Sequence, residues 1–125
     1  MANAAKTKLM PTTESFDPET AMRQVDNDAD LFKEIVGIFR EDYPQYLAKI
    51  DNAIAQGNAH DLEHYAHSLK GAVGNLGARQ VYEIALNLEI TGRSGALEKA
   101  PENINLLKQE LTKFEKELLE YSKTL

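Results

Sequence analysis

The spacing of the apolar residues constrains the fold of this chain more than any other feature of the sequence. From Leu31 to Tyr121 these residues recur every three or four positions, which is the spacing of one face of an α-helix. No segment alternates apolar and polar residues in the way that a half-buried β-strand does. The sequence therefore predicts an all-α protein.

Capping residues mark where the first two helices begin. Asp17 and Pro18 start a short helix that ends near Val25, and Asp28 caps a long second helix. The apolar stripe of the second helix stays in phase across Pro44, so we expect one kinked helix rather than two. The stripe consists of Leu31, Ile35, Ile38, Phe39, Tyr43, Tyr46, Leu47, Ile50 and Ile54.

Three further helices follow the long one. Gly57 ends the long helix, and Asn58 caps a third helix that runs to about Asn75. A fourth helix ends near Gly92, and Pro101 opens the last one. The apolar spacing of the last helix alternates three and four, as in a helix packed nearly parallel or antiparallel to its neighbours. These features predict an antiparallel four-helix bundle with a short extra N-terminal helix.

Composition excludes several classes of protein. The 125 residues suit one domain, which we place at residues 16–125 after a flexible N-terminal tail at residues 1–15. The chain has no cysteine, which excludes disulfides, thiolate metal sites and cysteine nucleophiles. Its formal net charge of −6 argues against nucleic-acid binding. No apolar run has the length of a signal peptide or a membrane span, so we expect a soluble cytoplasmic protein without a membrane partner.

His67 lies on the face of its helix opposite the apolar stripe. At about 100° per residue, Gly71 and Gly74 share this open face and Lys70 lies at its edge. A glycine inside a helix costs about 0.5–1 kcal/mol relative to alanine, so two of them indicate space cleared for another molecule. For Gly74 alone, fraying of the helix before Gly77 is the alternative. The predicted buried side consists of Leu62, Tyr65, Ala66, Leu69, Val73 and Leu76.

Two alternatives to a reactive histidine face remain open. His60, His64 and His67 are the only histidines, and they share one face of the predicted helix. Histidines four residues apart can bind Zn²⁺ or Cu²⁺, so a metal-binding bundle is the first alternative, although no further ligand cluster lies near them in sequence. The second alternative is an adaptor bundle that docks through an apolar patch and leaves the histidine face unused.

The segment His67-Ser68-Leu69-Lys70-Gly71, followed by Leu76-Gly77-Ala78, resembles the signature of histidine-containing phosphotransfer (HPt) domains of two-component phosphorelays. The resemblance covers the chain from about Phe16 to Tyr121. Outside the signature it rests on Leu31-Phe32, Phe39, Asp42, Pro44, Ala66 and Leu88-Glu89.

The resemblance implies that His67 accepts a phosphoryl group from the aspartyl phosphate of one receiver domain and passes it to the aspartate of another. The implied partners are the receiver domains of response regulators and a hybrid sensor kinase. No kinase activity and no cofactor are implied for this chain, because the receiver brings the Mg²⁺ and the acidic pocket. The sequence itself has no nucleotide-binding glycine loop and no obvious carboxylate cluster for magnesium.

The same resemblance implies roles for residues around His67. Glu89, on the following antiparallel helix, would bind the other ring nitrogen and fix the tautomer, unless it is an ordinary solvent-facing acid. Lys70 would help neutralise the incoming phosphoryl group, unless it is merely solubilising. The residues we expect to dock the partner are His64, Ser68, Gly71, Gly74 and Asn75. We expect a monomer, with a dimer through residues 104–121 as the alternative.

Overall fold

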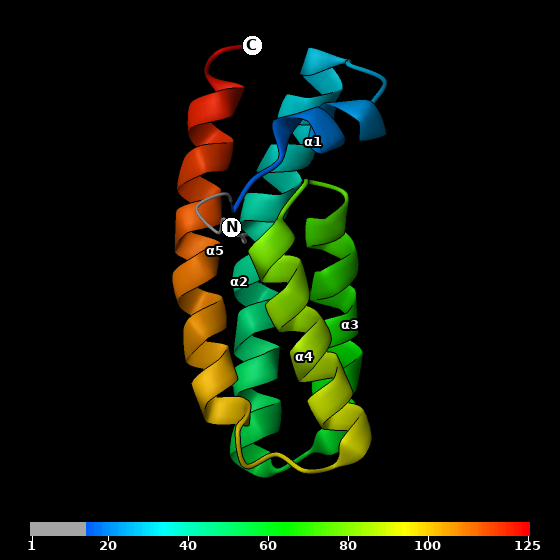
Figure 1. The fold of residues 1–125 in the computed structure, drawn as a ribbon, viewed down its shortest axis with the longest axis vertical. Coiled ribbons are helices and arrows are strands. Elements are labelled where there is room, and N and C mark those ends of the chain that lie inside the picture. The colour runs from blue at the N-terminus through cyan, green and yellow to red at the C-terminus, as the bar shows by residue number, and fades with distance from the viewer. Residues whose placement is uncertain (1–14) are drawn as a thin grey trace, which may run out of the picture.

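The computed structural model describes residues 15–125, which form an all-α bundle, as predicted (Figure 1). The predicted tail at residues 1–15 lies outside the described residues except for Ser15. That residue is buried, and its hydroxyl donates a hydrogen bond to Glu117 over 2.8 Å. The helices are α1 (Pro18–Gln24), α2 (Ala29–Gln56), α3 (Ala59–Gly74), α4 (Arg79–Ser94) and α5 (Ala100–Ser122).

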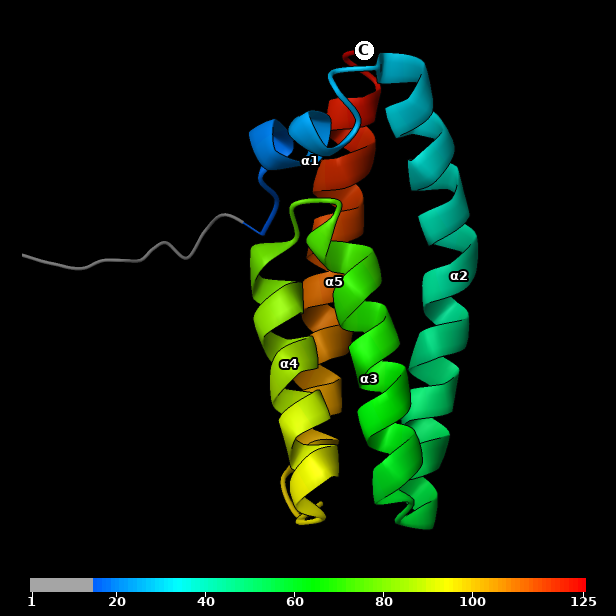
Figure 2. The ribbon, with the colours of Figure 1, turned by 90° about the vertical axis from the view of Figure 1, so that its right-hand side faces the viewer.

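The four long helices pack side by side to form the bundle. The helix α3 packs against α4 and α2, and α5 packs against the same two helices. Both α2 and α5 extend beyond the turn that joins α3 to α4, and α1 lies across the bundle at this end (Figure 2). The predicted antiparallel bundle with an extra N-terminal helix is therefore confirmed.

The predicted helix ends follow from local capping. The side chains of Asp17, Asp28 and Asn58 each accept a hydrogen bond from a backbone N–H three residues later. These bonds satisfy donors that the first turn of a helix leaves unpaired. Gly57 ends α2 with a φ of 66°, and α2 runs through Pro44 as one helix. Local sequence signals therefore set most of the boundaries.

The core register in the N-terminal half of α2 differs from the prediction. Leu31 and Ile38, which were expected inside, are 39% and 52% exposed. Phe32 and Val36 are buried instead, and the ring of Phe32 makes an edge contact with Tyr121 of α5 at a centroid distance of 5.7 Å. Because Leu31 and Phe32 are adjacent and both apolar, the sequence of this helix permits two overlapping apolar stripes, one through each residue. Packing against α5 selects the stripe that contains Phe32.

The end of α4 also differs from the prediction. The helix continues past Gly92, where we expected it to stop, and ends at Ser94. Gly92 is buried, and a Cβ there would lie 2.5 Å from the backbone nitrogen of Glu63 and 2.8 Å from the carbonyl oxygen of Ala59. A side chain does not fit between backbones this close, so Gly92 permits the close approach of α3 and α4. The helix-ending glycine is Gly95, with a φ of 79°.

The turn between α3 and α4 is bound to the segment before α1. The backbone N–H of Asp17 donates to the carbonyl oxygen of Gly77 over 2.8 Å, and Phe16 forms an isolated antiparallel bridge with Ala78. Gly77 has a φ of 73°, and a Cβ at this position would collide with the carbonyl oxygen of Asp17. Glycine is therefore required here both for its backbone angle and for the contact with α1.

Candidate functional site

His67 projects from α3 toward solvent, with 65% of its side chain exposed. The opposite face of α3 is buried, as predicted, and consists of Leu62, Ala66, Leu69 and Val73. Tyr65, which was also expected inside, is only half-buried. The core therefore holds the backbone of α3 while leaving the imidazole accessible.

Glu89 on α4 contacts the imidazole of His67. Its Oε2 atom lies 3.0 Å from Nδ1 of His67, although the two residues are 22 positions apart in the sequence. The side chain of Glu89 is only 7% exposed, so the contact joins a buried carboxylate to an exposed ring. The structure therefore brings together two residues that the resemblance implied would be in contact.

The contact with Glu89 determines which ring nitrogen of His67 is available. An ionised carboxylate only accepts hydrogen bonds, so Nδ1 of His67 carries a proton and donates a hydrogen bond to Glu89. In a neutral imidazole the other nitrogen then has a free lone pair. The ring nitrogen with an available lone pair is therefore Nε2.

Two cationic side chains bind the same carboxylate. The ammonium of Lys70 lies 2.8 Å from Oε1 of Glu89, and the guanidinium of Arg93 lies 3.0 Å from Oε2. The hydrogen bond from Lys70, followed by that from His67, holds the pKa of Glu89 below its ordinary value, although burial acts in the opposite direction. Glu89 is therefore ionised at neutral pH and available as an acceptor.

The side chain of Lys70 lies against the protein and does not extend into solvent. Its side chain is only 18% exposed, and its ammonium also lies 6.0 Å from the ring centroid of Tyr82. In this structure the charge of Lys70 is directed at Glu89. A contact between Lys70 and a phosphoryl group stays a prediction.

Sequence reasoning missed two residues of this charged cluster, Arg93 and Glu63. The Nε atom of Arg93 lies 3.0 Å from Oε2 of Glu63, while its terminal nitrogen binds Glu89. The available signal was spacing, because Arg93 follows Glu89 by four residues and Glu63 precedes His67 by four. That signal did not show that the two pairs face each other across α3 and α4.

The two glycines after His67 have different surroundings. Gly71 is exposed, and a Cβ at this position would meet nothing within 4 Å. A Cβ at Gly74 would lie 3.3 Å from the ring of Tyr82 on α4. Gly71 therefore has the open surroundings expected of a docking surface, whereas Gly74 accommodates a neighbouring helix.

The other expected docking residues lie at different distances from His67. His64 is exposed, and its ring contacts Tyr65 at a centroid distance of 4.9 Å. The hydroxyl of Ser68 donates to the carbonyl oxygen of His64 over 3.2 Å. Asn75 is exposed at the C-terminal cap of α3, eight residues from His67 and so about 12 Å along the helix axis. His64 and Ser68 flank the imidazole, and Asn75 does not.

The histidine face forms a hollow between α3 and α4. Its volume is about 340 Å³, and it is lined by His60, Glu63, His64, His67 and Glu89. Within residues 15–125, no three histidine, cysteine or acidic side chains are arranged to hold a metal ion. The metal-binding alternative therefore has no ligand set in the described part of the chain.

None of the helices in residues 15–125 is long and apolar enough to cross a membrane.

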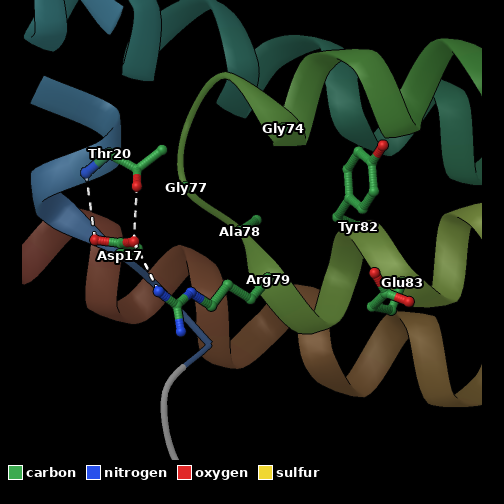
Figure 3. A pocket seen from close by; sticks show the side chains of 8 residues that line it. All are labelled: Asp17, Thr20, Gly74, Gly77, Ala78, Arg79, Tyr82 and Glu83. Atoms are coloured by element: carbon green, nitrogen blue, oxygen red, sulfur yellow. Dashed lines mark hydrogen bonds and ion pairs between the residues drawn. The ribbon is translucent and has the colours of Figure 1, made fainter. Parts of the chain in front are cut away.

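A second hollow, of about 440 Å³, lies beside the turn between α3 and α4 (Figure 3). Asp17 forms one side of it, where its carboxylate binds the hydroxyl of Thr20 at 2.7 Å and the guanidinium of Arg79 at 3.0 Å. Tyr82 forms another side, next to Gly74. None of the residues around this hollow belongs to the charged cluster of His67.

Both the sequence and the structure of this chain are similar to those of known proteins. Residues 34–117 match the family model of the Hpt domain. Histidine-containing phosphotransfer protein B (HptB) from Pseudomonas aeruginosa PAO1 has a similar structure, with a TM-score of 0.83 and 24% identity, over 91% of this chain and 99% of that one. The HPT domain of a sensor hybrid histidine kinase from Shewanella has a TM-score of 0.75 and 20% identity, over 89% of this chain and 96% of that one. No curated protein matches the sequence.

Proposed function

This chain belongs to the Hpt domain family, whose members carry phosphoryl groups in two-component phosphorelays, and we propose that His67 is its phosphoacceptor. Such domains work with receiver and kinase partners and are not catalysts in their own right. One observation carries the proposal: Nδ1 of the exposed ring of His67 lies 3.0 Å from the buried carboxylate of Glu89. This contact leaves Nε2 as the nucleophile.

The proposed step is an in-line displacement at phosphorus. The lone pair on Nε2 of His67 forms an N–P bond to the aspartyl phosphate of a receiver domain, and the P–O bond to the aspartate breaks. The aspartate leaves as a carboxylate, and the imidazole becomes positively charged while Nδ1 keeps its proton. The negative charge of Glu89, 3.0 Å from Nδ1, stabilises this cation. The reverse displacement delivers the phosphoryl group to a second receiver.

Lys70 supports this step by keeping Glu89 ionised. Its ammonium lies 2.8 Å from Oε1 of Glu89, and this bond is the largest contribution to the lowered pKa of that carboxyl group. We propose that Lys70 also contributes positive charge toward the phosphoryl oxygens during transfer. In both roles its charge acts next to the reacting ring.

The proposed partners are receiver domains of response regulators and of a hybrid sensor kinase. They would dock over the open surface at Gly71, with His64 and Ser68 at its side. The receiver would supply Mg²⁺ and its acidic pocket, so this chain would need no cofactor and have no kinase activity of its own. We further propose that it acts as a cytoplasmic monomer that binds neither nucleic acid nor membrane.

Transfer of label from a phosphorylated receiver domain tests the assignment of His67. We expect the chain to acquire label that is stable to base and labile to acid, as a phosphohistidine is. His67→Gln should abolish the label, whereas His60→Gln and His64→Gln should keep it, since these are the other two histidines of the chain. Retention of label by a folded His67→Gln variant would contradict the proposal.

A further inference from the structure

We propose that Glu63 and Arg93 are positioning residues that hold the carboxylate of Glu89 in place for His67, and so control the rate of phosphotransfer. This inference rests on the proposed role of His67. It concerns two side chains that the phosphotransfer step itself does not touch. Glu63 acts through Arg93, and Arg93 acts through Glu89.

The four side chains form a chain of contacts across two helices. Glu63 and His67 lie one turn apart on α3, and Glu89 and Arg93 lie one turn apart on α4. Arg93 binds Glu63 through Nε and Glu89 through its terminal nitrogen, each at 3.0 Å, and Glu89 binds His67 at 3.0 Å. Two nitrogens of one planar guanidinium therefore connect two carboxylates, a geometry that a lysine ammonium does not reproduce.

The packing of the helices brings these residues within reach. Gly92, immediately before Arg93, lies so close to α3 that a Cβ would come within 2.5 Å of the backbone nitrogen of Glu63. The short distance between the backbones allows the side chain of Arg93 to bind both acids. The side chain of Arg93 is 59% exposed and that of Glu63 is 33% exposed, so of the three charged side chains only Glu89 is buried.

Arg93 affects His67 because both bind the same oxygen, Oε2 of Glu89. The guanidinium restricts the rotation of the carboxylate, since Lys70 holds only the other oxygen. Glu63 keeps that guanidinium on Oε2 instead of leaving it free in solvent.

The charged and titratable groups that face His67 come from α3 and α4. Those on α3 are His60, Glu63, His64 and Lys70, and those on α4 are Glu89 and Arg93. The helix α2 packs on another side of α3, where its Lys49 lies over the ring of Tyr65 at 5.1 Å. Substitution of Arg93 therefore removes a cation from Oε2 of Glu89, the oxygen that also contacts His67. It leaves the contact between Lys70 and Oε1 in place.

Two measurements on the folded chain test this inference. The first is the tautomer of the neutral ring of His67, read from the ¹⁵N chemical shifts of its two nitrogens by NMR in the unphosphorylated protein. Arg93→Gln should lower the population of the tautomer with the proton on Nδ1. The second is the single-turnover rate of transfer from a phosphorylated receiver, which Arg93→Gln and Glu63→Gln should each lower about 2- to 5-fold. Arg93→Lys should also transfer slowly, because it retains the charge and loses the fork.

The double variant separates positioning from a general charge effect. If Glu63 acts through Arg93, Glu63→Gln should not slow transfer further in an Arg93→Gln background. The matched control is Arg79→Gln, which removes an arginine of α4 that is 64% exposed and bound to Asp17 at 3.0 Å. This control should change neither measurement.

Additive effects of the two substitutions, or wild-type transfer rates in both single variants, would overturn the inference. The tautomer measurement distinguishes this failure from failure of the proposed function. If His67 never acquires label, the proposed function is wrong, while the tautomer of His67 still reports whether Arg93 acts on the imidazole through Glu89.

Discussion

Nδ1 of His67 lies 3.0 Å from Oε2 of Glu89, and this contact joins a ring that is 65% exposed to a carboxylate that is 7% exposed. A side chain in solvent samples several rotamers, whereas a buried carboxylate bound by Lys70 and Arg93 is confined. The buried partner therefore orients the exposed one. The consequence is an accessible imidazole whose Nδ1 is held by Glu89.

Removal of the acceptor at position 89 should slow phosphotransfer. A hydrogen bond to a charged group contributes about 1.5–3 kcal/mol, so Glu89→Ala should lower the single-turnover rate about 10- to 100-fold. Glu89→Gln should fall between Ala and wild type, because it keeps an acceptor oxygen and loses the charge. Rapid-quench measurement of label transfer would show this order. Wild-type rates in Glu89→Ala would refute the orienting role.

The contribution of Glu89 to stability should be lost in acid. Its pKa in the folded protein lies below the ordinary value of 4.5, chiefly because of the hydrogen bond from Lys70. The unfolded chain therefore binds more protons near that pH, and stability rises with pH there. The difference in free energy of unfolding between wild type and Glu89→Gln should therefore shrink as the pH falls below 4.5. Urea denaturation from pH 3 to pH 7 measures it, and a difference that grew in acid would have the wrong sign.

Two glycine substitutions should affect stability in opposite directions. Gly92→Ala forces a methyl group against the backbone of α3 and should destabilise the fold by about 1–3 kcal/mol. Gly71→Ala meets nothing within 4 Å and should stabilise α3 by about 0.5–1 kcal/mol. Denaturant midpoints of the two variants provide the comparison. Equal effects would contradict the close approach of α3 and α4 at Gly92.

A matched pair in α2 should reveal which apolar stripe is in the core. Phe32→Ala removes a fully buried ring and should cost about 3–5 kcal/mol. Leu31→Ala removes a side chain that is 39% exposed and should change stability by about 0.5 kcal/mol or less. Thermal or urea unfolding of both variants measures the difference. A larger loss for Leu31→Ala would restore the register that the sequence alone suggested.

The all-α class, the continuous helix across Pro44 and the exposure of His67 could all be predicted from the amino-acid sequence. These features depend on local information, namely the period of one helix and the side chains that cap it. The capping side chains of Asp17, Asp28 and Asn58 bond within their own first turn, so no distant residue is needed to predict them.

The packing of the helices against one another determines which faces and side chains meet. It selected Phe32 over Leu31 for the core, assigned Gly74 and Gly92 to contacts between helices, and brought Glu63 and Arg93 into the cluster of His67. The helical period gives the direction of each side chain from its own axis. It does not give the distance or rotation between two helices, and contacts between α3 and α4 depend on both.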